Sequence, residues 1–166
     1  MDKTLILNDK QIKQRIERIA YQIYEDNYSE KEIIIAGIAK TGYVFAQKIE
    51  KALNRISDAK TILIKITVDK DKPLHTTIDE EFSEKALKNK VVILADDVLN
   101  SGKTMIYAMR TFLNADVKKI RTVLLVDRDH KRYPIAADYV GLTLSTTLRE
   151  HISVEFSSKG NAVYLQ

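Results

Sequence analysis

The chain has 166 residues, of which 45% are hydrophobic and 30% charged, with a formal net charge of +4. This length predicts a single domain, residues 1–166, that can bury a core without cross-links. The absence of cysteine excludes disulfides and thiolate metal sites, and is consistent with a cytoplasmic location. No apolar run has the length of a membrane span and the first residues do not resemble a signal peptide, so we expect no membrane partner.

The N-terminal segment predicts a short edge strand, Thr4–Leu7, followed by an amphipathic helix. Asn8 and Gln11 have the spacing of a capping box. The apolar residues at helical spacing are Ile12, Ile16, Ile19, Ala20 and Ile23. The basic residues off this stripe are Lys13, Arg15 and Arg18. We interpret these basic residues as a solvated helix face, with contact to nucleic acid as the alternative.

A second unit runs from strand to helix between residues 32 and 53. Ile33–Ala36 reads as a buried strand, Gly37–Gly42 as a loop of small residues, and the apolar pattern from Val44 to Leu53 as a helix. A loop that opens a helix exposes unpaired backbone N–H groups and the positive end of the helix dipole. We therefore predict an anion site at this loop.

The next segments are a strand and a long polar connection. Thr61–Val68 is rich in β-branched residues and reads as a strand, whereas Asp69–Leu87 has almost no apolar periodicity. A long segment without secondary structure inside a compact domain is usually functional, so we predict a lid.

The most informative stretch is residues 91–112. Val91–Ala95 reads as a strand buried on both faces, and Asp96 and Asp97 follow where the strand should end. Asn100–Gly102 forms a turn before a helix predicted over Thr104–Phe112, which again makes an anion site. Two carboxylates can bind hydroxyl groups and hold Mg²⁺ through water. Together these features predict a site for a phosphorylated sugar.

Gly102-Lys103-Thr104 is similar to the end of a nucleotide-binding P-loop, so this alternative was weighed. A P-loop requires a glycine five positions before its second glycine, and Asp97 occupies that place. The P-loop hypothesis is therefore rejected.

The C-terminal part completes an alternation of strands and helices. Ile120–Val126 reads as a buried strand ending at Asp127, and Ala137–Leu144 and Ile152–Phe156 as further strands. This order predicts an α/β fold with a mostly parallel sheet flanked by helices. We expect the N-terminal run and the segment after Asp127 to form a small hood over the active edge.

The 91–105 stretch resembles the phosphoribosyl pyrophosphate (PRPP) motif of the type I phosphoribosyltransferases. This resemblance implies their fold and the Mg²⁺-dependent transfer of a phosphoribosyl group from PRPP to a nucleobase, with release of pyrophosphate. It places Asp96 and Asp97 on the ribose hydroxyls and, through water, on the metal, and makes Asp96, Asp97 and Asn100 the catalytic residues. The residues expected to bind PRPP are Lys40, Thr41, Asp96, Asp97, Asn100, Ser101, Gly102, Lys103 and Thr104.

The resemblance also suggests roles for the loop and the lid. The loop after the second strand would hold the pyrophosphate, with Lys40-Thr41 as the candidate for a cis peptide bond. The lid would close over PRPP and exclude water, and Lys70, Lys72 and His75 are the lid residues that could face the pyrophosphate.

Residues 125–156 resemble the bacterial PyrR family, regulators of the pyrimidine operon that also have uracil phosphoribosyltransferase activity. In this pattern Val126, Asp127, Tyr139 and Val140 would form the base pocket, with Tyr139 stacked on the base. The resemblance also implies a homodimer.

Three departures from the family patterns affect the functional prediction. The lid has Asp69–Lys72 in place of Arg-Asp-Asp, and Ala136 and Leu142 replace basic residues that serve RNA binding, so RNA is disfavoured as a partner. Asn100 stands where the hypoxanthine-type enzymes have aspartate, which favours uracil as the base. The alternatives are a hypoxanthine/guanine-type enzyme and a PRPP-sensing RNA-binding regulator with little catalysis.

Overall fold

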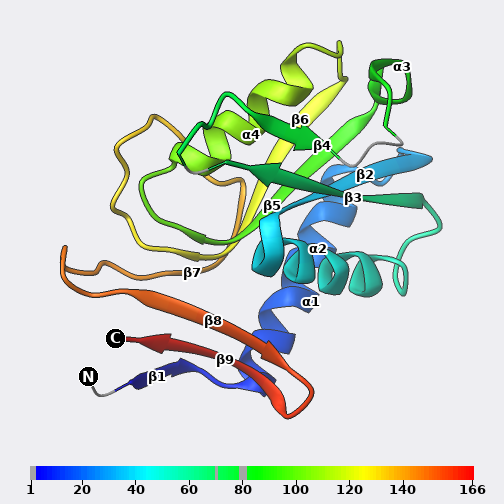
Figure 1. Cartoon of the computed structure of the whole chain (residues 1–166). Coiled ribbons are helices and arrows are strands. Elements are labelled where there is room, and N and C mark those ends of the chain that lie inside the picture. The colour runs from blue at the N-terminus through cyan, green and yellow to red at the C-terminus, as the bar shows by residue number, and fades with distance from the viewer. Residues whose placement is uncertain (1–2, 70, 79–81) are drawn as a thin grey trace.

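The computed structural model describes residues 3–69, 71–78 and 82–166 (Figure 1). Its main sheet has six strands in the order β4-β3-β2-β5-β6-β7. All neighbours in this sheet are parallel except β4, which is antiparallel to β3. The strands are β2 (Glu32–Ile38), β3 (Lys60–Val68), β4 (Thr76–Ile78), β5 (Val91–Leu99), β6 (Lys119–Asp127) and β7 (Tyr139–Thr143). The predicted α/β fold with a mostly parallel sheet is confirmed.

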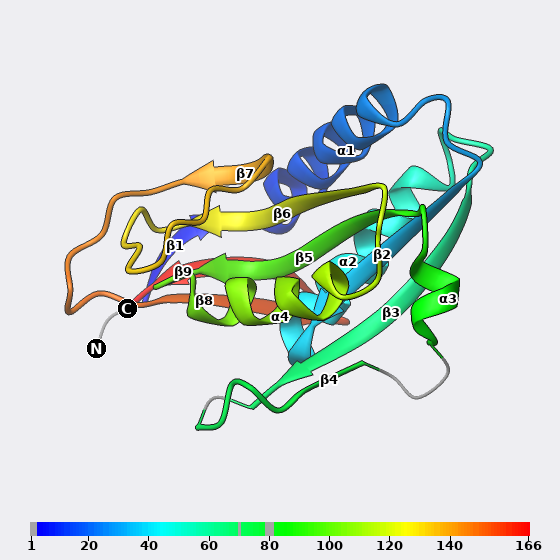
Figure 2. The same ribbon diagram turned by 90° about the horizontal axis from the view of Figure 1, so that it is seen from above.

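Helices cover both faces of this sheet, which explains why the central strands β2, β5 and β6 contain long apolar runs. Helices α1 (Asp9–Asp26) and α2 (Ala39–Leu53) lie below the sheet in Figure 1 and α4 (Lys103–Leu113) above it. Alternate residues of β2 serve the two cores: Ile33 and Ile35 pack with α1 and α2, whereas Ile34 packs on the α4 side. Figure 2 shows the arrowheads of β3, β5, β6 and β7 at the same edge, so their carboxyl ends meet there.

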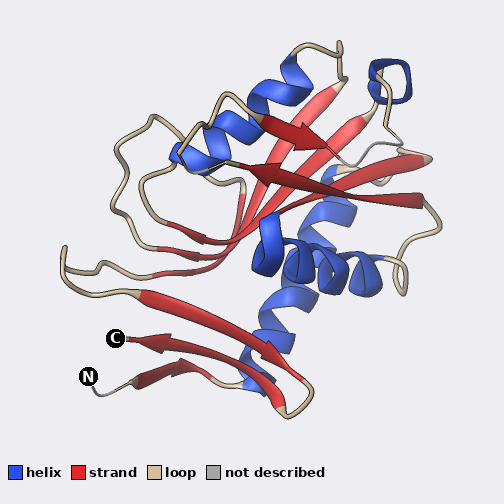
Figure 3. Cartoon of the chain, in the orientation of Figure 1, coloured by secondary structure: helices blue, strands red, loops and turns tan. Residues whose placement is uncertain are grey.

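A second, antiparallel sheet of three strands stands apart from the main sheet (Figure 3). It consists of β1 (Thr4–Leu7), β8 (Ile152–Ser157) and β9 (Gly160–Leu165), in the order β1-β9-β8. This is the predicted hood, built from the two ends of the chain. The sequence did not predict β9, and part of the segment after Asp127 instead supplies β7 to the main sheet. Among the described residues, no helix is long and apolar enough to cross a membrane.

Several predicted boundaries were wrong at the carboxyl edge. Residues 37–42 are not a loop, because β2 continues to Ile38 and α2 begins directly at Ala39, whose φ is 50°. Asp96 and Asp97 lie inside β5 and not after it, since β5 extends to Leu99. The connection 69–87 also contains secondary structure, namely β4 and the short helix α3 (Glu84–Leu87). Lys70 lies outside the described residues.

A polar cluster at the opposite, amino-terminal edge of the sheet fixes the end of α1. The hydroxyl of Tyr139, at the start of β7, donates to the carboxylate of Asp26 at 2.5 Å. Arg121, near the start of β6, donates to the same carboxylate oxygen at 2.9 Å. These two hydrogen bonds, that of Arg121 first, lower the pKa of Asp26 from 3.8 to about 2. Burial and the hydrogen bond to Asp26 raise the pKa of Tyr139.

This cluster predicts a pH-dependent contribution to stability. Because the folded pKa of Asp26 is lowered to about 2, its stabilising effect should be complete above about pH 4 and lost as the pH falls towards 2. Asp26→Asn should cost about 1 kcal/mol of unfolding free energy near pH 7, since the pair is partly exposed. Urea unfolding across this pH range measures the unfolding free energy of both proteins. The difference between Asp26→Asn and wild type should become smaller as the pH falls. A difference that is constant with pH contradicts the assignment, and Asp58→Asn, at an exposed position, is the matched control.

Candidate active site

The main sheet opens between β2 and β5, and this opening forms the site. Pairing of β5 with β2 ends at Ala95 opposite Gly37, whereas pairing of β5 with β6 continues to Leu99 opposite Asp127. The connection from β2 runs through α2 to β3, and the connection from β5 runs through α4 to β6. The chain thus leaves these neighbouring strands in opposite directions, which is where open α/β sheets form a ligand crevice.

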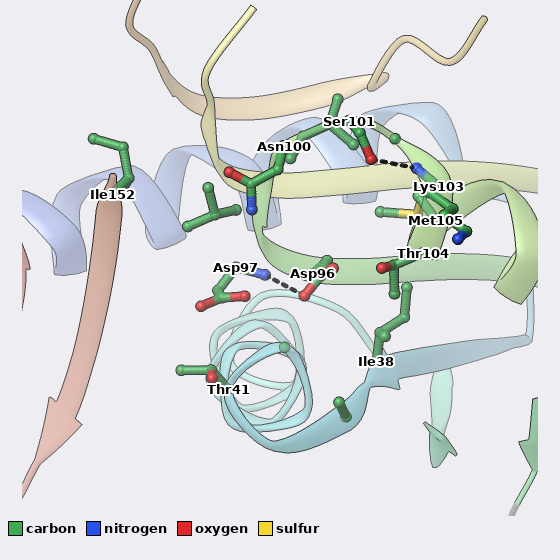
Figure 4. A pocket seen from close by; sticks show the side chains of 15 residues that line it. Ile38, Thr41, Asp96, Asp97, Asn100, Ser101, Lys103, Thr104, Met105 and Ile152 are labelled. Carbon is green, nitrogen blue, oxygen red and sulfur yellow. Dashed lines mark hydrogen bonds between the residues drawn. The ribbon is translucent and has the colours of Figure 1, made fainter. Parts of the chain in front are cut away.

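A cavity of about 290 Å³ occupies this crevice (Figure 4). It is bounded by the ends of β2 and β5, the first turns of α2 and α4, and one residue of the hood. The lining residues are Ile38, Ala39, Thr41, Gly42, Asp96, Asp97, Val98, Leu99, Asn100, Ser101, Gly102, Lys103, Thr104, Met105 and Ile152.

The two helices that begin at the cavity lack side-chain caps. By contrast, α1 is capped by Asn8, with the predicted capping box to Gln11, and α3 by Ser83. Neither α2 nor α4 has a side-chain hydrogen bond at its N-cap. An uncapped helix N-terminus presents backbone N–H groups and a positive dipole end, which bind anions. One cavity is therefore lined by two helix N-termini suited to anions, on opposite faces of the sheet.

The acidic pair lies between these two helix ends. The backbone N–H of Asp97 donates to Oδ1 of Asp96 at 2.9 Å, and both side chains are half-buried. Helix α2 approaches β5 closely at Gly42, where a Cβ atom would lie 2.6 Å from Oδ1 of Asp96. Glycine at this position lets the helix end reach the carboxylates. In Figure 4 Asp97 lies between Thr41 and Asn100.

The loop before α4 has a defined conformation. Gly102 has φ of 83°, which favours glycine, and a Cβ atom there would lie 2.6 Å from Ile135. The backbone N–H groups of Arg132 and Tyr133 both donate to the carbonyl of Ser101. The hydroxyl of Ser101 in turn accepts from the N–H of Lys103 at 3.3 Å (Figure 4). The loop is therefore held in place by the segment after β6.

The acidic pair fits Mg²⁺ only as part of a shared coordination sphere. Among the described residues, no group of three or more His, Cys, Asp and Glu side chains could hold a metal. Mg²⁺ commonly takes one or two carboxylates from the protein and completes its octahedron with water and substrate phosphates. Two neighbouring carboxylates beside two anion positions suit that kind of coordination.

Most of the predicted PRPP-binding residues do meet in this cavity. Those that line it are Thr41, Asp96, Asp97, Asn100, Ser101, Gly102, Lys103 and Thr104. Lys40 is the exception, because its side chain is exposed and it is not among the lining residues. The described residues contain no cis peptide bond, so the bond between Lys40 and Thr41 is trans.

The predicted base-binding residues need correction. Tyr139 is only 7% exposed and its hydroxyl binds Asp26 at the amino-terminal edge of the sheet, so it cannot stack on a base in this cavity. The carbonyl of Val140 accepts from Arg18. Val126 and Asp127 pair with cavity-lining residues of β5 but do not line the cavity themselves.

Sequence reasoning missed seven lining residues: Ile38, Ala39, Gly42, Val98, Leu99, Met105 and Ile152. Six of them belong to the predicted strand-to-helix units, whereas Ile152, the first residue of β8, comes from a distant segment. It lines the cavity from the hood, at the start of β8 (Figure 4). Its only signal was an apolar residue opening a predicted strand. Of the basic residues predicted on a solvated helix face, Lys13 and Arg18 are exposed, whereas Arg15 is half-buried. Both arginines also donate to the carbonyl of Gly141 in β7, which the sequence did not indicate.

Comparison with known proteins identifies the family. The model of the family described as "Phosphoribosyl transferase domain" matches residues 3–159, so the chain belongs to the phosphoribosyltransferase family. Within it, the chain is similar to proteins named bifunctional protein PyrR, which confirms the predicted resemblance. The relative from Clostridium novyi is 35% identical and the match spans 93% of this chain and 91% of the relative. The relative from Staphylococcus aureus is 34% identical over the full length of both.

Solved structures confirm the type I phosphoribosyltransferase fold. The hypoxanthine phosphoribosyltransferase of Trypanosoma cruzi superposes with a TM-score of 0.79 at 18% identity, covering 98% of this chain and 96% of that one. At this level of identity the likeness concerns the fold.

Proposed function

We propose that this phosphoribosyltransferase transfers the phosphoribosyl group of PRPP to uracil and releases pyrophosphate, with Mg²⁺ as cofactor. The observation that carries the proposal is the pair of uncapped helix N-termini on either side of two carboxylates in one cavity. PRPP has the matching pattern, because a phosphate and a pyrophosphate stand at opposite ends of a ribose with vicinal hydroxyls.

Each end of PRPP has a position in this arrangement. The loop Asn100–Thr104 and the start of α4 would bind the 5′-phosphate, with Lys103 contributing positive charge. Asp96 and Asp97 would accept hydrogen bonds from the ribose hydroxyls. They would also accept hydrogen bonds from water molecules bound to Mg²⁺. The start of α2, with Thr41, would bind the pyrophosphate. Mg²⁺ would neutralise charge on the departing pyrophosphate.

The reaction needs the protein mainly for positioning and charge stabilisation. The N1 lone pair of uracil forms the new bond to the anomeric carbon of ribose. The bond from that carbon to the pyrophosphate oxygen breaks, with both electrons leaving on pyrophosphate, and the N1 proton passes to pyrophosphate or water. We place the base between Ile152 of the hood and Asn100, since these residues line the cavity beside Asp97. Ile152 would thus take the packing role first assigned to Tyr139.

The proposal includes a cytoplasmic homodimer, as in the family resemblance, and no RNA partner. Arg15 and Arg18, the basic residues of α1 considered for nucleic acid, are engaged in hydrogen bonds to backbone carbonyls of β7. Ala136 and Leu142 provide no charge.

Asp97→Ala should abolish measurable PRPP binding and leave the fold intact. Asp97 is half-buried at the cavity, where its loss removes charge-assisted hydrogen bonds without opening a core. Titration calorimetry with PRPP and Mg²⁺ measures the affinity, and circular dichroism checks the fold. Asp58→Ala, at an exposed carboxylate outside the cavity, is the matched control. An unchanged affinity for PRPP in Asp97→Ala would remove the central claim.

Uracil should be preferred over hypoxanthine and guanine. In a 6-oxopurine the proton state of N7 must be managed during transfer, and the neutral amide of Asn100 cannot take over a proton as aspartate can. The loss of such a group typically costs about 10²–10⁴-fold in rate. Steady-state kinetics with each base at saturating PRPP tests this, and a kcat/KM for a purine that equals or exceeds that for uracil would favour the purine alternative. Asn100→Asp should shift the ratio towards the purines.

RNA affinity should be absent at physiological salt. A gel-shift titration with the leader transcript of a pyrimidine operon, with a scrambled transcript as control, measures it. Tight, sequence-selective binding with little turnover of any base would instead favour the regulator alternative.

A further inference from the structure

Arg128 is a buried arginine next to the cavity, with every contact directed at one of two segments. It follows β6 directly and is 7% exposed. Its Nη1 donates to Oδ1 of Asn100 at 2.7 Å and its Nε to the hydroxyl of Thr146 at 3.0 Å. Its Nη2 donates to the carbonyls of Thr147 and Glu150. The side chain thus joins the cavity loop to the segment that leads into β8.

The contact with Arg128 determines which way the Asn100 amide faces. A guanidinium group can only donate, so the amide atom that faces it must be the oxygen. The amide nitrogen is therefore directed elsewhere, and Figure 4 shows it on the side of Asp97, inside the cavity. Asn100 consequently offers the cavity a hydrogen-bond donor and not an acceptor.

The positive charge of Arg128 also strengthens the Asn100 amide as a hydrogen-bond donor. The four oxygens that accept from its guanidinium group belong to an amide, a hydroxyl and two backbone carbonyls, all of them neutral. The carboxylate of Glu150 interacts with this charge only from a distance, as the last of the causes that lower its pKa, and it accepts no hydrogen bond from the guanidinium group. The buried positive charge therefore remains available to stabilise negative charge nearby. Hydrogen bonds in series also polarise one another, so the amide N–H of Asn100 becomes a stronger donor.

We propose that Arg128 is a positioning residue that orients and polarises the Asn100 amide to bind the carbonyl oxygen beside the reacting nitrogen of a pyrimidine. The inference rests on the proposed function and deepens it. When N1 of uracil gives up its proton and bonds to the anomeric carbon, negative charge is shared between N1 and the neighbouring oxygen O2. The Asn100 N–H donates a hydrogen bond to O2 and stabilises its charge. The positive charge of Arg128, on the opposite side of the amide, strengthens this hydrogen bond.

Arg128 also has a structural role, which the test must separate. Its contacts with residues 146–150 hold the segment that ends at Ile152, so any substitution could displace the hood. A displaced hood would affect all bases alike. A lost stabilisation of charge would depend on how acidic the base is.

The decisive experiment compares uracil with 5-fluorouracil, whose N1–H is more acidic because fluorine withdraws electrons. Arg128→Met removes the positive charge and keeps an unbranched side chain in its place. It should lower kcat/KM for uracil by about 10²-fold. The loss for 5-fluorouracil should be clearly smaller, because the more acidic base needs less stabilisation. PRPP affinity by calorimetry should stay within about twofold of wild type.

A double-mutant cycle with Asn100→Ala tests whether Arg128 acts through that residue. In the Asn100→Ala background, Arg128→Met should lower kcat/KM much less than in wild type, since contacting residues are coupled. Arg149→Met is the matched control, at an exposed arginine of the same segment, and should leave kcat/KM unchanged. If Arg128→Met does not fold, Arg128→Lys permits the same comparison, because an ammonium group lacks the planar fork.

Equal losses for the two bases, or independent effects of the two substitutions, would overturn the inference while leaving the proposed function intact. A wild-type protein that binds PRPP but does not use uracil would instead overturn the proposed function, and this inference with it.

Discussion

The structure of the site depends on one constraint, the separation of β5 from β2 at residue 95 while β5 continues beside β6. Because the two strands feed crossovers in opposite directions, α2 and α4 begin on opposite faces of the sheet at the same edge. The N–H groups of both helix starts then point to one crevice, where that of Lys103 donates to the Ser101 hydroxyl, and the acidic pair at the end of β5 lies between the two helices. A local motif could not bring the starts of two helices on opposite faces of the sheet to one crevice.

The four helices in the described part of this chain differ in how their N-termini are capped. The two helices that begin away from the cavity satisfy their first N–H groups with Asn8 and Ser83, as a stable helix normally does. The two that begin at the cavity forgo side-chain caps, and Ala39 adopts a left-handed conformation that costs about 1–3 kcal/mol. A bound anion would supply the missing partners, so binding energy can offset this local cost.

The two edges of the sheet serve different purposes. At the amino-terminal edge, one carboxylate oxygen of Asp26 accepts from both Tyr139 and Arg121, which ties α1 to β6 and β7. At the carboxyl edge, the buried guanidinium group of Arg128 donates only to neutral oxygens, one of which is the amide oxygen of Asn100. One polar cluster thus fixes the end of α1 at one edge, and the other joins the cavity loop to the segment before β8 at the opposite edge.

The sequence by itself determined the α/β class, the capped first helix and the acidic pair followed by an anion-binding turn, because each follows from local periodicity or spacing. It also indicated that 100–104 would line the site, since these residues adjoin the pair along the chain. The tertiary structure decided what depends on distant contacts. It turned Tyr139 towards Asp26, 113 residues away, brought Ile152 of the hood over the cavity, and paired Arg128 with Asn100. A cavity lined by segments far apart in sequence has no local pattern, so only the packing of the hood against the sheet defines it.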